Sequence, residues 1–226
     1  MAWQIVKRED SFQGSDKPFI SISSDHVSFN AMFSRVAEIG PEKRVIFHID
    51  PETRRVGFEF TSDERPDSFA LSRASSDKKG KKRTGLFCSA GPLRDHPWII
   101  SISKLSVPDR RFYNPKKEGQ MWVIQLCPAF EERKARESAN IPSDANGIYR
   151  YVREGGEIVY IGRGNIKKRL SSPERLEWDF DIVEYSVIAD PDLQIKWEEY
   201  WIQRFSKENG QLPFYNKISG FSTEGE

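Results

Sequence analysis

Two tyrosines, Tyr149 and Tyr160, are spaced so that a β-hairpin would bring their side chains together. The sequence predicts strands over residues 147–153 and 158–162, with a glycine turn between them. In such a hairpin the tyrosines are diagonal neighbours on one face, with their hydroxyls within reach of each other. Tyrosine is also a common strand residue, so neither tyrosine alone indicates a function. Their pairing makes the hairpin a candidate catalytic site.

The glycine turn also determines which residues face each other. The expected facing pairs are Arg153 with Ile158, Tyr151 with Tyr160, and Tyr149 with Gly162. A glycine opposite a tyrosine leaves an open floor on which a phosphate could rest.

A short helix capped by Asn165 is expected to follow the hairpin. Arg169 comes three residues after Ile166 and should lean toward the sheet, whereas Lys167 and Lys168 should point to solvent. An inward arginine beside two tyrosines suits a bound phosphate.

The last predicted helix, over residues 191–208, separates two adjacent glutamates. Glu198 shares its face with apolar residues such as Trp201 and Ile202, whereas Glu199 belongs to the polar face. A carboxylate on an apolar face needs a cation or a hydrogen-bond partner, and a divalent metal supplies one. A buried ion pair with the inward arginine is the alternative. One carboxylate suits one Mg²⁺ or Mn²⁺ ion per site, with several waters, better than a pair of metals.

The segments Gly147-Ile148-Tyr149 and Tyr160-Ile161-Gly162 resemble the signature of the GIY-YIG nuclease family. The resemblance covers residues 147 to about 218 and implies a three-stranded antiparallel sheet flanked by helices, with the third strand over residues 180–188. Arg163 matches a basic position seen in many family members. The other matching residues, in the order that the family requires, are Tyr149, Tyr160, Arg169, Glu198 and Asn216.

This resemblance implies a metal-dependent DNA endonuclease that leaves 5′-phosphate and 3′-hydroxyl ends. Residues 141–226 contain no histidine, so a tyrosine, a lysine or a metal-bound hydroxide must act as the base. The family resemblance favours Tyr149 as the base and Tyr160 as the residue that positions water or phosphate, and the exchanged roles remain open. Glu198 would hold the metal, Arg169 would stabilise the developing charge and Asn216 would brace the site.

Two domains of the α+β class are expected, joined by a charged and then small, polar connector over residues 131–146. The domain over residues 1–130 is predicted to be mostly β with one helix at about 30–39, and the nuclease domain spans residues 147–220, with a tail at 221–226. The strands expected in the front domain cover residues 19–23, 45–50, 56–61, 68–72, 98–103 and 121–127, and a hairpin joins the second to the third.

Composition excludes several classes of protein. Hydrophobic residues make up 37% and charged residues 31% of the 226 residues, which is typical of a globular protein. No apolar stretch reaches the ~18 residues that a membrane helix needs. Two scattered cysteines indicate neither a disulfide framework nor a structural zinc site, and they favour a reducing, cytoplasmic location.

The charge is unevenly distributed along the chain. Residues 1–140 hold 24 Lys and Arg against 19 Asp and Glu, whereas residues 141–226 hold 11 against 15. A front domain that binds double-stranded DNA would explain this imbalance. Basic loops are also ordinary surface features. The cluster over residues 78–83 has the composition of a nuclear import signal. The cations expected to contact DNA are Lys78, Lys79, Lys81, Lys82, Arg83, Arg110, Arg111, Lys116 and Lys117.

The sequence also contains the residue types of a second nuclease pattern, PD-(D/E)xK. Asp109 follows a proline, and Glu132 and Lys134 would supply the second half. That half must lie on a strand, whereas we expect a strandless connector there, so we interpret the match as coincidence.

Three functions follow in order of preference. The first is a type II restriction endonuclease, which would act as a homodimer beside a methyltransferase that modifies the same site. The second is a mobile-element or repair nuclease that nicks DNA. The third is a DNA-binding module with an inactive nuclease fold.

Overall fold

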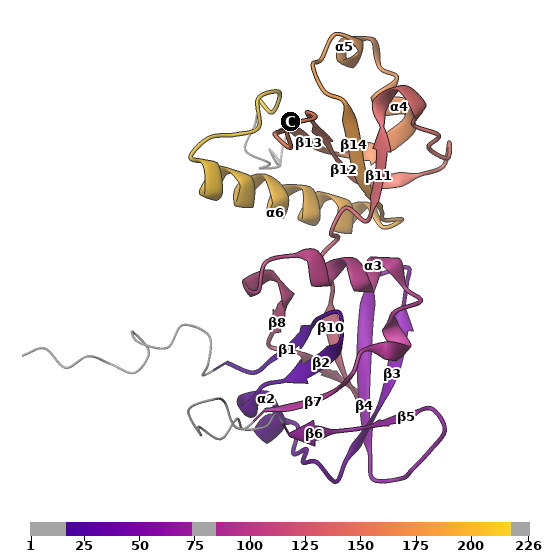
Figure 1. Cartoon of the computed structure of the whole chain (residues 1–226), viewed down its shortest axis with the longest axis vertical. Helices are drawn as coiled ribbons and strands as arrows, with labels where there is room; N and C mark the ends of the chain where they lie inside the picture. Colours follow the sequence, from indigo (N-terminus) through magenta and orange to yellow (C-terminus); the bar gives the residue numbers. More distant parts are fainter. Residues whose placement is uncertain (1–16, 74–84, 218–226) are drawn as a thin grey trace, which may run out of the picture. The chain divides into compact units, whose positions relative to one another are not determined.

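The computed structural model describes residues 17–73 and 85–217 of the chain (Figure 1). The chain divides into two compact units, Met1–Leu126 and Cys127–Glu226, which we call unit 1 and unit 2. Every strand pairing among the described residues is antiparallel, and helices are few, so the predicted α+β class is confirmed. None of the described helices is long and apolar enough to span a membrane.

Unit 1 contains two five-stranded sheets (Figure 1). Sheet A has the order β6-β7-β2-β1-β8, formed by β1 (Phe19–Ile22), β2 (His26–Phe29), β6 (Ser72–Arg73), β7 (Leu86–Ser89) and β8 (Arg111–Tyr113). Sheet B has the order β5-β3-β4-β10-β9, formed by β3 (Arg44–Asp50), β4 (Arg55–Thr61), β5 (Ser68–Ala70), β9 (Lys116–Glu118) and β10 (Met121–Gln125). The helical segments are α2 (Ala31–Val36), η1 (Gly91–Leu93), α3 (Pro97–Ile100), η2 (Ser101–Lys104) and η3 (Pro108–Arg110).

The core of unit 1 lies between the two sheets because their strands alternate apolar and polar residues. Ile20 and Phe29 of sheet A are fully buried and face each other. The Phe29 ring packs edge-on against Phe58 and Phe60 of sheet B, with ring centroids 5.6 and 5.4 Å apart. The opposite face of sheet A therefore carries the other half of its residues, outside this core.

Several predicted elements of unit 1 are confirmed. The β3–β4 hairpin closes where expected, and α2 begins at Asn30, whose side chain accepts a 2.8 Å hydrogen bond from the Phe33 amide. The strand expected over residues 98–103 is wrong, because that segment forms α3 and η2. Ile99 and Ile102, both fully buried, are three residues apart, which is helical spacing. Unit 1 therefore has more helix than the single one predicted.

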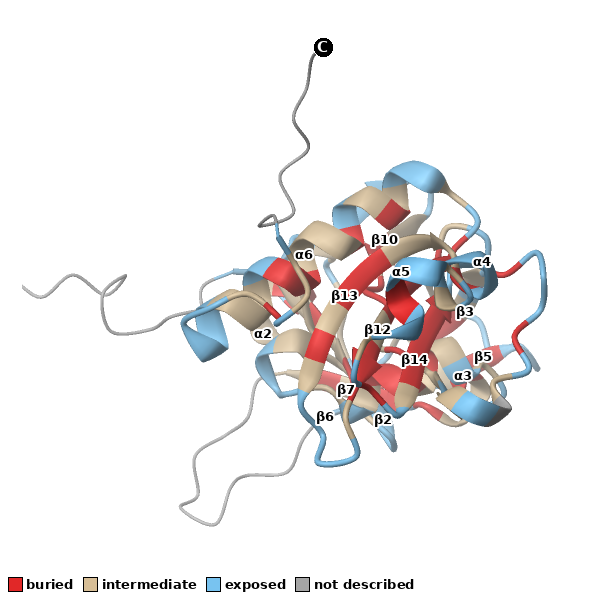
Figure 2. Cartoon of the chain, turned by 90° about the horizontal axis from the view of Figure 1, so that it is seen from above, coloured by how far each residue is buried: buried red, intermediate tan, exposed pale blue. Residues whose placement is uncertain are grey.

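Unit 2 contains one four-stranded sheet of order β11-β14-β12-β13 (Figures 1 and 2). Its strands are β11 (Glu132–Ala135), β12 (Asn146–Val152), β13 (Ile158–Asn165) and β14 (Ile182–Val187). Its helical segments are η4 (Arg136–Ser138), α4 (Ile166–Leu170), α5 (Pro173–Leu176) and α6 (Pro191–Asn209).

The strand β11 corrects two expectations. The sheet has four strands rather than three, because Glu132–Ala135 pairs with β14 inside the segment predicted to be a strandless connector. A charged sequence is acceptable at the edge of a sheet, where polar side chains reach water. Arg133 faces Glu184 and binds its carboxylate at 3.3 Å. The second half of the PD-(D/E)xK pattern does therefore lie on a strand, while Asp109 belongs to unit 1.

The β12–β13 hairpin has most of its predicted register. Tyr149 faces Gly162 and Tyr151 faces Tyr160, as expected. The register shifts after Tyr151, so that Val152 rather than Arg153 faces Ile158. The Arg153 amide instead bonds the Glu157 carbonyl at the turn. The tyrosine positions are unaffected because the irregularity lies beyond them.

The helix boundaries in unit 2 follow their caps. The Asn165 side chain accepts from the Lys168 amide at 2.9 Å at the start of α4. Asp190 accepts from the amides of Asp192 and Leu193 at the start of α6, and Gly210 ends that helix with a φ of 72°. The helix predicted over residues 191–208 is confirmed.

We expect Phe29→Ala to destabilise unit 1 by about 4 kcal/mol, because it empties the contact between the two sheets. Val36→Ala on α2, where the side chain is 50% exposed, should change stability by less than about 0.5 kcal/mol. Urea unfolding followed by amide hydrogen exchange in β2 and β4 measures both. Equal effects of the two substitutions would contradict this location of the core.

Candidate functional site

Three tyrosines lie on one face of the β12–β13 hairpin. The rings of Tyr149 and Tyr160 are 6.0 Å apart, and each lies within 5.5 Å of Tyr151. A Cβ atom at Gly162 would lie 2.9 Å from the Tyr149 hydroxyl and 2.8 Å from the Tyr160 hydroxyl. The two hydroxyls therefore converge over Gly162, as the predicted register requires. The open floor expected there is wrong, because the tyrosines themselves occupy it.

A buried arginine on α5 joins the three hydroxyls. Arg175 is 5% exposed and donates to Tyr149 at 2.5 Å, to Tyr160 at 3.1 Å and to Tyr151 at 3.3 Å. Its guanidinium also lies over the Tyr160 and Trp178 rings, at 4.8 and 5.2 Å from their centroids. Sequence reasoning missed this residue, because α5 is only four residues long and begins at a proline, which by itself also marks the end of a helix.

A second arginine holds α5 in place. Arg136 donates to the backbone carbonyls of Trp178 at 2.6 Å, Leu176 at 2.8 Å and Arg175 at 3.2 Å. Its guanidinium stacks on Phe180 at 4.2 Å. Carbonyl groups at the end of a short helix need donors, and this side chain supplies them. The position of Arg175 thus depends on a residue beside β11.

Glu198 pairs with Arg163 and not with Arg169, which we had considered as its partner. The Arg163 Nη1 donates to Glu198 Oε2, and the glutamate side chain is 15% exposed. Burial raises the pKa of Glu198, although Arg163 and Arg169 act in the opposite direction. Glu199 instead accepts a bond from Gln203 in an exposed setting. The predicted difference between the two adjacent glutamates is therefore confirmed.

Arg169 lies at the rim of the site. It is exposed, as Lys167 and Lys168 are, so the expectation that it is directed inward is wrong. Its Nε nevertheless lies 3.9 Å from where a Cβ of Gly164 would be, and it is close enough to Glu198 to affect the pKa of that carboxyl. Gly164 has a φ of 107°, which favours glycine.

Asn216 fastens the outer edge of β13. Its Oδ1 accepts from the Ile161 amide at 2.9 Å, and its Nδ2 donates to the Ile161 carbonyl at 2.8 Å. The Tyr215 amide bonds the Val159 carbonyl at 2.9 Å. Asn216 therefore holds the residue next to Gly162, where the predicted bracing role requires it.

The predicted site residues lie around β13, some on each of its two faces and Asn216 at its edge. Tyr149 and Tyr160 lie on the Gly162 face, whereas Arg163 alternates to the other face and meets Glu198 there. Among the described residues, no hydrogen bond joins the tyrosines to Glu198. The site thus consists of two groups that meet at residues 162–164.

The burial of Tyr149 bears on the choice of base. Tyr149 is fully buried, and burial together with Tyr160 and Tyr151 raises its pKa well above the usual value, against the effect of Arg175. A phenol in that position stays protonated at neutral pH. Tyr160 is partly exposed. Of the two tyrosines, Tyr160 is therefore the one whose hydroxyl lies nearer to solvent, as the exchanged roles would require.

A cation at this site would depend on Glu198. Within the described residues, no group of three or more His, Cys, Asp or Glu side chains is arranged to hold a metal. A single carboxylate with phosphate and water oxygens is sufficient for Mg²⁺ in many phosphate-binding sites. The donor set fits one such ion, provided that Arg163 shares the Glu198 carboxylate.

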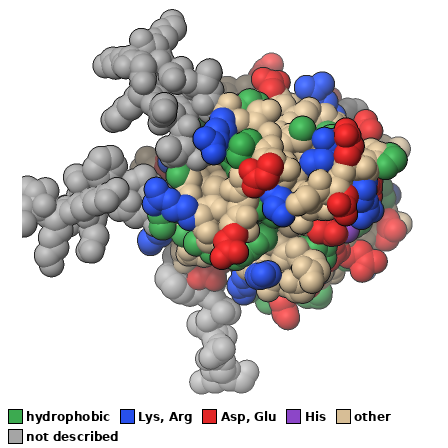
Figure 3. Space-filling model, turned by 90° about the horizontal axis from the view of Figure 1, so that it is seen from below, with side chains coloured by type: hydrophobic (Ala, Val, Ile, Leu, Met, Phe, Trp, Pro, Cys, Tyr) green, Lys and Arg blue, Asp and Glu red, His purple; other side chains and the backbone are tan. Residues whose placement is uncertain are grey.

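The cations predicted to contact DNA fall into three places. Arg110 ends η3 and Arg111 begins β8 of sheet A, whereas Lys116 and Lys117 lie on β9 of sheet B. Lys78, Lys79, Lys81, Lys82 and Arg83 lie outside the described residues. On the face shown in Figure 3, Lys and Arg side chains are interspersed with Asp and Glu.

Arg175→Ala should destabilise unit 2 by about 3 kcal/mol, because three hydroxyls, those of Tyr149 and Tyr151 buried, lose their donor. The matched control is Arg133→Ala, which removes a guanidinium that is 61% exposed and should cost less than about 1 kcal/mol. Thermal unfolding of both variants measures the difference. Similar melting temperatures would show that the tyrosines do not need Arg175.

Alkaline pH should weaken unit 2 through Tyr149. Below its usual pKa this phenol is protonated in the folded and the unfolded chain, so it adds no pH dependence. Above about pH 10 the unfolded chain releases the proton while the folded chain keeps it, which favours unfolding. Melting temperatures from pH 8 upward should therefore fall more steeply in the wild type than in Tyr149→Phe, and parallel curves would contradict the burial of this hydroxyl.

No family model matches the chain, and neither does any curated protein or solved structure.

Proposed function

We propose that the chain is a metal-dependent endonuclease that hydrolyses phosphodiester bonds in DNA, with its active site at residues 162–164. The observation that carries the proposal is that the end of β13 holds a tyrosine hydroxyl on one face and, on the other, one largely buried carboxylate that is paired with Arg163 and close to Arg169. Cations bind the charged phosphate, a hydroxyl orients water, and a lone carboxylate suits a hard metal ion.

Each side chain has a task in this reaction. Arg169, exposed at the rim, binds a non-bridging phosphate oxygen, and Arg163 does so when it shares Glu198 with a cation. Tyr160 accepts a hydrogen bond from Arg175, holds the attacking water in line with the phosphate and, as the base, takes the proton of that water. The leaving 3′ oxygen takes a proton from solvent. Bound Mg²⁺ or Mn²⁺ would stabilise charge on the phosphate and the leaving oxygen.

The remaining side chains support this arrangement. Tyr149 keeps its proton and fixes the Arg175 guanidinium from below. Asn216 keeps β13 in register beside the reacting group by holding both backbone groups of Ile161. The products, by resemblance to the GIY-YIG nucleases, carry 5′-phosphate and 3′-hydroxyl ends.

The biological role that we propose is a type II restriction endonuclease in the cytoplasm. Unit 1, with its separate cations, would bind the double-stranded DNA, and a homodimer would cut both strands. A methyltransferase acting on the same sequence would protect the host DNA. A nicking nuclease of a mobile element or of repair shares the chemistry and differs in cutting one strand.

Glu198→Gln should abolish cleavage of unmethylated phage DNA in magnesium and leave DNA binding intact, because it removes the metal ligand but keeps the volume. Glu199→Gln on the same helix should retain activity within about 2-fold, since surface substitutions away from a site have small effects. Gel electrophoresis of the digested DNA and a mobility-shift assay measure the two properties.

The products separate the proposed roles. Discrete bands from the wild type identify a site-specific enzyme, and conversion of plasmid to an open circle alone identifies a nicking enzyme. Equal loss of activity in both glutamine variants would contradict the role of Glu198. DNA that stays uncut in magnesium and in manganese, although the protein binds it, would support the binding-only alternative.

A further inference from the structure

The outer face of sheet A in unit 1 carries one row of facing residues across all five strands. Since facing residues of adjacent strands point to the same side, the row lies opposite the buried Phe29 face. From β6 to β8 the row consists of Ser72, Phe87, Ser28, Ser21 and Arg111. Small residues thus occupy its middle and large ones lie on either side.

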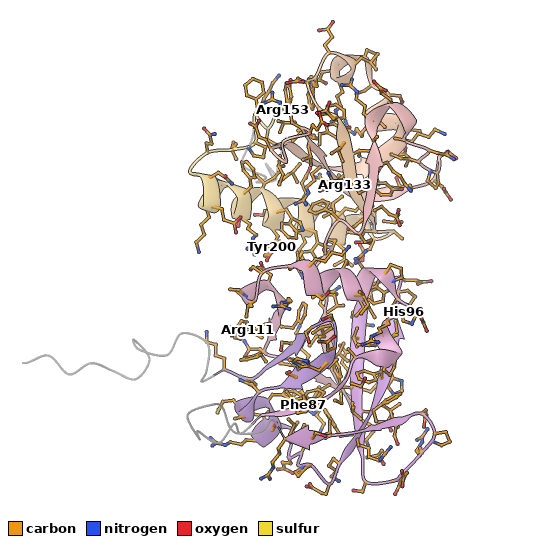
Figure 4. The ribbon with its side chains drawn as sticks, in the orientation of Figure 1. Phe87, His96, Arg111, Arg133, Arg153 and Tyr200 are labelled. Atoms are coloured by element: carbon orange, nitrogen blue, oxygen red, sulfur yellow. The ribbon has the colours of Figure 1, made fainter. Side chains whose placement is uncertain are left out.

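Aromatic side chains form the two walls of this face. On one side the His26 and Phe87 rings pack edge-on, with centroids 6.0 Å apart. On the other side the Arg111 guanidinium lies 5.3 Å over the Phe19 ring. Figure 4 labels Phe87 and Arg111, which mark the two sides. Between the walls the two strands β1 and β2 contribute only serine side chains.

A cavity of about 850 Å³ follows these walls. We call it the serine trough, and its defining residues are Phe19, Ser21, His26, Ser28, Phe87 and Arg111. Arg110 also lines it. Among the described residues, no carboxylate forms a salt bridge with Arg110 or Arg111, and neither serine hydroxyl has a hydrogen-bond partner. The trough therefore offers flat aromatic surfaces, unused hydroxyls and positive charge.

These features match an unpaired nucleotide better than a base pair. The aromatic rings and the stacked guanidinium provide faces on which a base can stack, and the faces of bases inside a duplex are already covered. Serine hydroxyls can bond the base edge or the sugar, and the arginines can contact the flanking phosphates. The sheet forms the floor of the cavity, and a base turned out of its stack can lie against it.

We propose that the serine trough binds unpaired nucleotides of DNA, either in single strands or where a base is extruded from the duplex. The inference rests on the proposed function in taking DNA as the ligand, and it goes further by naming the form of DNA that unit 1 holds. An enzyme built in this way recognises DNA at a distorted or opened position.

The test is the anisotropy of a fluorescein-labelled oligothymidine, measured with full-length Glu198→Ala protein so that the probe is not cut. Phe87→Leu and Arg111→Ala should each weaken binding about 10-fold. Arg111→Ala should also make the dependence of log affinity on log salt shallower by about 0.7. The binding of a paired duplex of the same length should respond less to Phe87→Leu.

Matched controls lie on sheet B. Lys43→Ala, just before β3 of that sheet, removes a cation whose Nζ donates to the Ser62 hydroxyl at 2.8 Å. Phe69→Leu alters a partly buried ring on the edge strand β5. Both controls should bind oligothymidine as tightly as the parent protein, and the melting temperatures of all four variants should show that the fold is kept.

The inference is overturned if the trough variants bind oligothymidine as their controls do, or if Phe87→Leu weakens the binding of paired DNA as much as the binding of unpaired DNA. It is separable from the proposed function, since binding is measured without cleavage. Trough-dependent binding by a wild type that cuts no DNA would uphold the trough and reject the nuclease. Cleavage by a protein whose trough variants bind normally would do the reverse.

Discussion

The candidate site depends on how one buried guanidinium is solvated. Among the described residues, no carboxylate forms a salt bridge with Arg175, so three phenols and the faces of aromatic rings must replace water around its charge. Each phenol oxygen has to point at α5 for this to work. The orientation of the Tyr160 hydroxyl is therefore set by Arg175 on α5, a helix of four residues. Arg136 in turn holds α5 by donating to the backbone carbonyls of Leu176 and Trp178.

Strand β13 is where this buried network reaches the surface. Its alternation sends Tyr160 and Gly162 to one face and Arg163 to the other, so a single strand presents a hydroxyl and a cation to different neighbours. Gly164, with its positive φ, ends the alternation and brings the backbone toward Arg169. The phosphate chemistry that we propose for this point uses the end of a regular strand.

Sequence patterns with a local cause were predicted well. The hairpin register around Tyr149, the cap at Asp190 and the division of the adjacent glutamates follow from turns, capping and helical spacing, which act within a few residues. The tertiary features were not predicted. β11 is charged and becomes a strand only because β14 offers an edge, and Arg175 is distinguished from other arginines only by the three tyrosines around it. The sequence around β11 does not reveal its pairing with β14, and the sequence around Arg175 does not reveal the three tyrosines that it contacts.

The bond between Asn216 and β13 also decides which surfaces remain available for self-assembly. β13 is the outermost strand of its sheet, and an uncovered edge of this kind readily recruits a strand from another molecule. The side-chain amide of Asn216 and the amide of Tyr215 occupy the free backbone groups between Val159 and Ile161. Tyr215 and Asn216 thus block the addition of a foreign strand along Val159–Ile161 of that edge.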